Sequence, residues 1–94
     1  MTTDPVQVIH RAAVHRFEAT VEGHLAVAEY EIAGDGAVTF THTHVPPELR
    51  GRGIAEQLVR AALAWARAEG RRVVPACSYV EAFIRRHAEF QVLL

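Results

Sequence analysis

The chain has 94 residues, half of them apolar, and a formal net charge of −1 at pH 7. A chain of this length buries roughly two-thirds of its unfolded surface, enough for one hydrophobic core, so we predict a single domain over residues 1–94. The near-neutral charge gives no electrostatic basis for binding nucleic acid or a membrane surface.

The single cysteine, Cys77, excludes an intramolecular disulfide and a multi-thiolate metal site. Residues 1–7 have neither a basic start nor an apolar run, and no apolar stretch approaches the roughly 20 residues of a transmembrane helix. These features predict a cytoplasmic protein with a free thiol. The sequence leaves both a monomer and a homodimer open.

The first half of the chain predicts antiparallel strands. Apolar, β-branched and aromatic residues recur over 6–10 and 14–21, and residues 24–33 alternate between two faces. Gly34-Asp35-Gly36 tolerates positive φ, so residues 37–45 should form the second arm of a hairpin. Alternation in that arm predicts one shared face for Val38, Phe40, His42 and His44.

Helical spacing of apolar residues from Ile54 to Trp65 predicts a helix over about 51–69, closed by Gly70 in the left-handed conformation. Residues 71–77 then read as a short strand parallel to 37–45. A right-handed crossover of this kind places the start of the helix and Cys77 at the same edge of the sheet, so one ligand could contact both.

Two elements are predicted at the end of the chain. Ser78-Tyr79-Val80-Glu81 has the composition and spacing of a capping box, which predicts a second helix from Ser78 to about His87. The tail ends in Val92-Leu93-Leu94, which is apolar enough to predict a last short strand packed on the core.

The turn before the first predicted helix has no Ser, Thr, Asn or Asp that could cap the helix with a side chain. Gly51 and Gly53 permit a ligand to approach the backbone closely, while Arg50 and Arg52 add positive charge. With the helix dipole, these features predict an anion site, most naturally for phosphate. The alternative is a water-capped helix after a Gly-rich turn.

This arrangement resembles the GNAT superfamily of acetyl-coenzyme A-dependent N-acetyltransferases. The family's pyrophosphate motif, Gln/Arg-x-x-Gly-x-Gly/Ala after a strand, is matched by Arg50-Gly51-Arg52-Gly53-Ile54-Ala55. The resemblance covers about residues 24–90. It is closest to a short single-domain subgroup with His42-Thr43-His44-Val45 before the motif and Cys77-Ser78-Tyr79 after the next strand.

The resemblance implies a truncated GNAT-like fold of the mixed α/β class, with antiparallel N-terminal strands followed by strand, helix, parallel strand and helix. It also implies acetyl-CoA as the cofactor, with backbone groups near Val45 pairing with the pantetheine arm. The thioester would lie between the diverging strands 37–45 and 71–77. The implied cofactor-binding residues are Val45, Arg50, Gly51, Arg52, Gly53, Ile54 and Ala55.

The family resemblance leaves two parts of the site open. Many members carry a tyrosine acid where this chain has Ile84. The chain also has little room for the N-terminal helices and C-terminal strands that build the acceptor pocket in longer members.

Amide-forming acyl transfer needs a base for the amine proton and a means of stabilising or protonating the departing thiolate. We predict His42 as the base, because histidine titrates near neutrality and, of the two histidines beside the predicted thioester, His42 also fits the pattern of the short subgroup. The alternative is that His42 and His44 merely extend an apolar strand face. We predict no metal site, because these two histidines lack further ligands nearby.

Cys77 precedes a predicted helix, whose dipole lowers the pKa of a thiol, so it could protonate the leaving thiolate or take the acyl group itself. Alternatively, Cys77 is a small buried apolar side chain. Tyr79 is a third candidate proton donor, or a packing residue. We expect the remaining histidines to be solvated: His10, His15, His24 and His87.

The sequence therefore predicts an N-acetyltransferase whose acceptor is an unidentified amine: a protein lysine, an N-terminus or a small amine. One alternative is a CoA-binding or acyl-sensing module with little turnover, which could acylate itself at Cys77. A second is a small interaction domain whose Gly-Arg-Gly loop binds no nucleotide.

Overall fold

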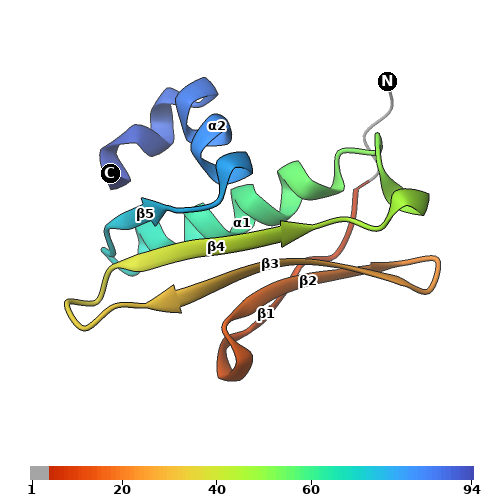
Figure 1. The fold of residues 1–94 in the computed structure, drawn as a ribbon, viewed down its shortest axis with the longest axis horizontal. Helices are drawn as coiled ribbons and strands as arrows, with labels where there is room; N and C mark the ends of the chain where they lie inside the picture. The colour runs from red at the N-terminus through yellow and green to blue at the C-terminus, as the bar shows by residue number, and fades with distance from the viewer. Residues whose placement is uncertain (1–4) are drawn as a thin grey trace.

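A computed structural model describes residues 5–94 and contains one five-stranded sheet in the order β1-β2-β3-β4-β5 (Figure 1). Strands β1 to β4 are antiparallel, and β5 runs parallel to β4. This mixed α/β architecture confirms the predicted fold class. The elements are β1 (Ile9–Arg11), η1 (Ala12–Val14), β2 (Arg16–Val21), β3 (His24–Ile32), β4 (Val38–His44), η2 (Pro47–Leu49), α1 (Ile54–Ala68), β5 (Val73–Pro75), α2 (Ser78–Arg86) and η3 (Ala88–Leu93).

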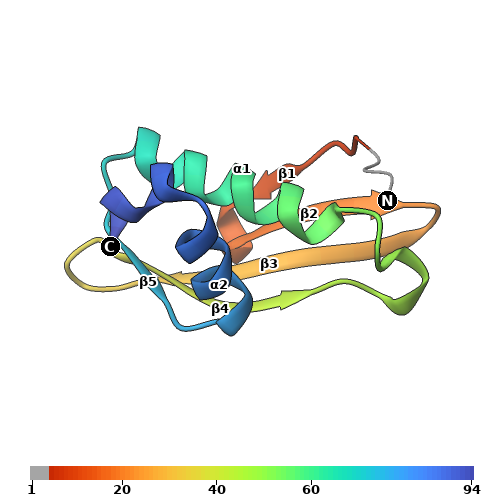
Figure 2. The ribbon, with the colours of Figure 1, turned by 90° about the horizontal axis from the view of Figure 1, so that it is seen from above.

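Both α-helices pack on one side of the sheet. Helix α1 crosses behind the strands in Figure 1, and α2 lies beside α1 along the β5 edge, as the view from above shows (Figure 2). The opposite face of the described sheet carries no helix. Burial of apolar area between sheet and helices is the main source of stability. The largest fully buried side chains are Phe40, Phe83, Leu49, Ile54, Leu58, Leu63, Ile84, Val38, Val59, Val73 and Val80.

Helix α1 begins three residues later than predicted, at Ile54, because Gly51 and Gly53 have φ of 79° and 75° and lie outside the helical region. Its C-terminus agrees with the prediction. Gly70 has φ of 67°, its N–H donates to the carbonyl of Arg67, and the next N–H closes a Schellman motif on Ala66.

A β-bulge in β4 overturns the predicted face of the two histidines. Tyr30 pairs with Phe40, but Glu29 pairs with His42, so Thr41 is an extra residue in β4. The alternation therefore shifts by one position, and Thr43 lies opposite the buried Ala28. His42 and His44 consequently lie on the helix-free face, and the prediction that they share a face with Phe40 is wrong.

The C-terminal elements differ from the predictions in detail. Strand β5 is shorter than expected, since Pro75 cannot continue the ladder. The predicted capping box is wrong: the N-cap of α2 is Cys77, and no side chain caps the helix. The predicted last strand is also wrong, because residues 88–93 form the 3₁₀-helix η3. Its period of three residues turns both Phe90 and Leu93 into the core.

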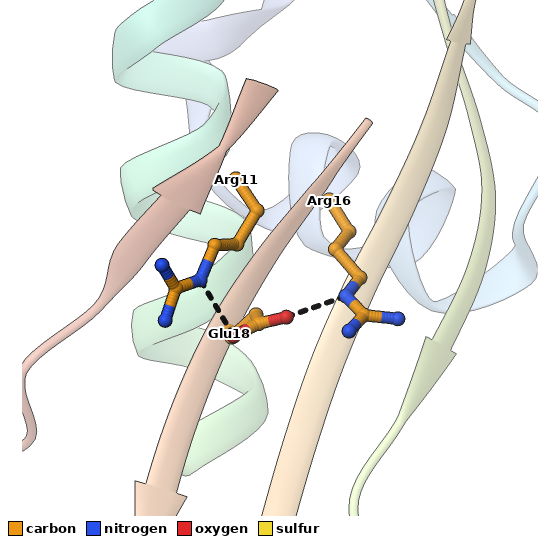
Figure 3. A network of polar contacts seen from close by, with 3 residues as sticks. All are labelled: Arg11, Arg16 and Glu18. Atoms are coloured by element: carbon orange, nitrogen blue, oxygen red, sulfur yellow. Dashed lines mark hydrogen bonds and ion pairs between the residues drawn. The ribbon is translucent and has the colours of Figure 1, made fainter. Parts of the chain in front are cut away.

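The helix-free face of β1 and β2 carries a network of three charged residues (Figure 3). Glu18 is only 8% exposed, and it accepts hydrogen bonds from Arg11 Nε at 3.1 Å and Arg16 Nε at 2.5 Å. The hydrogen bonds from Arg16 and then Arg11 lower the pKa of Glu18 below its usual value. The carboxylate is therefore paired on both sides.

Two of the histidines expected to be solvated are instead packed. His10 stacks on Phe17 with ring centroids 4.0 Å apart, and its Nε2 lies 2.6 Å from the Tyr30 hydroxyl oxygen. Burial lowers the pKa of His10. His87 stacks on Phe83, and its Nδ1 lies 2.7 Å from the Phe83 carbonyl oxygen. The prediction was wrong for these two because each ring completes an aromatic cluster.

Candidate functional site

The N-terminus of α1 presents a run of backbone donors. Gly53 is the N-cap and provides no side chain that could accept from them. Five residues in the turn and first helical positions have backbone N–H groups that donate to no protein acceptor within residues 5–94. Such a run, with the positive end of the helix dipole behind it, is suited to an anion. The five residues are Gly51, Gly53, Ile54, Ala55 and Glu56.

A groove leads away from these donors. A cavity of about 250 Å³ is lined by Gly51, Gly53 and Ile54 among others, and an adjoining cavity of about 340 Å³ extends to Thr43 and His44. The groove therefore joins the Gly-rich turn to the end of β4. The two cavities share four lining residues: Val45, Arg50, Ala55 and Tyr79.

The two arginines of the turn differ in what they contact. Arg50 Nε donates to the carbonyl of Val45 at 3.1 Å, which ties the turn to the end of β4 while Arg50 still lines the groove. Arg52 forms a bidentate pair with Glu22 at 3.2 and 3.3 Å, so this guanidinium fixes the turn to the β2–β3 hairpin. Arg50 is thus the better placed of the two to meet an anion in the groove.

Strands β4 and β5 separate at the far end of the groove. Their ladder ends where Phe40 pairs with Pro75, and the N–H of Cys77 then donates to the carbonyl of Phe40 at 2.9 Å. Along the described chain, no strand pairs with residues 41–44 on the β5 side. An extended ligand could therefore pair with this edge of β4.

Cys77 lies at this point of separation. Its Sγ is 3.6 Å from Thr43 Oγ1, a contact made possible by the bulge that turns Thr43 inward. Burial alone raises the pKa of the thiol, but hydrogen bonding by the Val80 and Tyr79 amides and by Thr43 outweighs it. The net pKa of Cys77 is therefore lowered, which favours the thiolate.

Tyr79 lines both cavities and is half-buried. Burial, with a smaller contribution from the nearby Glu56 carboxylate, raises the pKa of its phenol. The hydroxyl therefore stays protonated at neutral pH and can act as a donor. Ile84, at the position of the expected tyrosine acid, is buried in the core and cannot do so.

The structure brings Cys77 and Tyr79 to the groove but sets His42 apart from them. His42 and His44 are exposed on the helix-free face, with ring centroids 6.1 Å apart. His44 still lines the outer end of the groove. Over residues 5–94, there is no group of three or more His, Cys, Asp or Glu that could hold a metal ion.

Comparison with known proteins identifies the family. Residues 16–93 match the model of the GCN5-related N-acetyl-transferase family. The chain belongs to this family. The Protein NATD1 of Bos taurus is 35% identical over 85 residues, covering 88% of this chain and 75% of that protein. The Gallus gallus and Homo sapiens proteins of the same name are 34% and 33% identical over the same length, covering 77% and 75% of their chains.

The sequence did not reveal the contacts that two residues make at this candidate site. Glu22 lies in a turn 30 positions from its partner Arg52, and no local pattern marks such a pair. Thr43 was assigned to the wrong face, because alternation alone does not reveal a bulge.

No helix of the described residues is long and apolar enough to cross a membrane.

Proposed function

We propose that this protein binds acetyl-CoA at the N-terminus of α1 and transfers the acetyl group to an amine. The observation that carries the proposal is that, within residues 5–94, the backbone amides of Gly51 and of residues 53–56 donate to no protein acceptor and open into a groove in a GCN5-related chain. Amides at a helix N-terminus favour the charge and geometry of a diphosphate. Both glycines of the turn leave the backbone accessible to it.

The pantetheine arm would follow the groove toward Thr43. Among residues 5–94, no strand pairs with the β5-side edge of β4 beyond Phe40, so the backbone groups on that edge are available to the two amides of pantetheine. At Val45 the carbonyl accepts from Arg50, which leaves the N–H as the group offered to the ligand. This path brings the thioester to the gap between β4 and Cys77.

In the reaction, the neutral amine nitrogen attacks the thioester carbonyl carbon, forming the C–N bond, and the C–S bond breaks with its electron pair going to sulfur. The nitrogen loses a proton, which we assign to His42, and the thiolate gains one. Tyr79 is the favoured donor because its raised pKa keeps the hydroxyl protonated. Cys77 is less suited to this role because its pKa is lowered.

The lowered pKa of Cys77 supports a second candidate function, an acyl-CoA-binding module that acylates itself. The thiolate would attack the thioester carbon, and CoA would leave as the thiol after taking up a proton. Intact-mass measurement after incubation with acetyl-CoA separates the two functions. A stable adduct with no acetylated amine would favour the module.

Calorimetric titration tests the proposed donor. Acetyl-CoA should bind, while S-acetylpantetheine, which lacks the diphosphate, should bind much more weakly. Gly53→Glu should abolish binding, because it places a carboxylate at the amides. Absence of heat with millimolar acetyl-CoA, for a protein whose folding is verified by circular dichroism, would refute the proposal. The single-domain organisation and cytoplasmic location remain part of this proposal.

A further inference from the structure

Two arginine side chains anchor the turn that carries the proposed donor site. Arg50 Nε donates to the Val45 carbonyl, and the Arg52 guanidinium donates to both carboxylate oxygens of Glu22. The first contact lies within the connection from β4 to α1. The second reaches the β2–β3 hairpin, which lies at the same end of the molecule (Figures 1 and 2). The pair of Arg52 and Glu22 therefore links the turn to a different part of the sheet.

The conformation of this turn is not fixed by its own residues. Gly51 and Gly53 flank Arg52 and have φ of 79° and 75°. Glycine adopts negative φ about as readily as positive φ, so the peptide groups beside Arg52 could rotate and turn their N–H groups away from a ligand. An anchored Arg52 side chain restricts that rotation. A loop that is already held in its ligand-binding conformation binds more tightly, because less conformational entropy is lost on binding.

Glu22 is an unfavourable residue for its own position. Val21 pairs with His24, so Glu22 and Gly23 form a two-residue hairpin loop with φ of 53° and 79°, as in a type I′ turn. Such loops favour Asn, Asp or Gly at the first of these positions, and a long side chain in the left-handed region is strained. Strained residues persist where the surrounding structure requires them, and they cluster at functional sites. Here the strained residue is the one whose side chain reaches Arg52.

We propose that Glu22 is a positioning residue for the cofactor: by holding Arg52, it keeps the amides of the Gly-rich turn directed at the diphosphate. This inference rests on the proposed function. It assigns Arg52 an anchoring role, because the bidentate pair directs the guanidinium to the hairpin. A second approach at the same place supports the hairpin as the anchor, since His24 Nδ1 lies 3.9 Å from Glu48 Oε1 in η2.

The sign of the effect separates this role from a competing one. If the diphosphate drew Arg52 away from Glu22, loss of the carboxylate would release the guanidinium and tighten binding. If Glu22 positions the turn, its loss weakens binding even though one negative charge is removed. The Glu22 side chain is 67% exposed, so solvent and salt screen its repulsion of the diphosphate. The loss of anchoring should therefore dominate.

Glu22→Asn is the most informative variant. Asparagine is favoured at this position of the hairpin loop, but its side chain is one methylene group shorter, too short for the bidentate contact with Arg52. Its Kd for acetyl-CoA, measured by calorimetry, should rise about fivefold. Its Tm should equal or exceed that of wild type, whereas a purely structural role of the pair would lower Tm. Glu22→Gln removes the same charge but keeps the length and an acceptor oxygen, so it should raise Kd less than about twofold. In an Arg52→Ala background, Glu22→Asn should have no further effect on Kd.

Order parameters from ¹⁵N relaxation test the positioning without the cofactor. The amides of Gly51 and Gly53 should have lower order parameters in Glu22→Asn than in wild type. Arg72→Gln is the matched control, because it removes another exposed ion pair that anchors a hairpin, the 3.3 Å contact with Asp35 at the opposite end of β3. It should change neither Kd nor these order parameters.

Unchanged or tighter binding of acetyl-CoA by Glu22→Asn would overturn the inference, as would order parameters at Gly51 and Gly53 that match those of wild type. A wild-type protein that binds no acetyl-CoA would instead refute the proposed function. The order parameters, which need no cofactor, distinguish these two failures.

Discussion

Replacing Gly51 with alanine is the most direct test of the amide site. Gly51 has φ of 79°, and a Cβ built there meets no atom within 4 Å. The added methyl group therefore clashes with no neighbouring group, but it occupies space beside the unpaired amides at the mouth of the groove. Gly51→Ala should weaken acetyl-CoA binding while the protein stays folded.

The magnitude follows from two separable effects. Forcing alanine into a left-handed conformation costs about 1–2 kcal/mol of stability, which lowers Tm by roughly 4–8 °C per kcal/mol in a chain of this size. A hydrogen bond from an amide to a charged phosphate contributes about 1.5–3 kcal/mol. Losing one such bond should raise Kd for acetyl-CoA about 10- to 100-fold.

Gly70→Ala is the matched control. Gly70 has φ of 67°, also has no atom within 4 Å of a built Cβ, and lies at the opposite end of α1. Both variants should lose similar stability in a thermal melt, but calorimetry should show weaker binding for Gly51→Ala alone. Equal losses of affinity in the two variants would show that backbone strain, and not a blocked phosphate site, explains the effect. An unchanged Kd for Gly51→Ala would refute the site.

Three further predictions concern single side chains. In the folded wild-type protein, the pH at which Cys77 is alkylated at half its maximal rate should be lower than in the denatured chain. Thr43→Val should raise this midpoint pH in the folded protein, because Thr43 helps to lower the pKa of the thiol. An unchanged midpoint in the variant would contradict this role of Thr43. Tyr79→Phe should lower kcat about 10²-fold with little change in Kd for acetyl-CoA, and an unaltered kcat would exclude the hydroxyl as the acid. Because the pKa of Glu18 is lowered in the folded state, its contribution to stability is present above the unfolded pKa of about 4.3 and is lost as pH falls through the folded value. Glu18→Gln should therefore lower Tm at neutral pH and flatten the acid limb of a Tm-versus-pH curve; parallel curves for the two proteins would contradict the assignment.

Most of the fold follows from local sequence patterns. Alternation over 24–33, the Gly34-Asp35-Gly36 turn and the 3.6-residue spacing in α1 are short-range signals, and the structure agrees with each. The parallel crossover to β5 followed from the order of elements alone. Residues 88–94 contain both apolar residues spaced three apart, which fit a 3₁₀-helix, and a short apolar run, which fits a strand. Local pattern therefore could not decide between the two structures for the tail.

The groove was partly predictable. The sequence before α1 contains no residue whose side chain could cap the helix, and in the structure no side chain caps it. The roles of the two arginines were not predictable, because Arg52 is held by a residue in a distant hairpin. Likewise, the predicted capping box failed because Cys77 occupies the N-cap position, one residue before the serine that fits the pattern.

The bulge at Thr41 has the largest consequence for the chemistry. With regular alternation, His42 would lie under the helices beside Phe40, on the same face as the groove, and Thr43 would point away from Cys77. The extra residue reverses both orientations. In the proposed reaction, the base His42 and the acid Tyr79 therefore lie on opposite faces of the sheet, so a proton cannot pass directly from one side chain to the other.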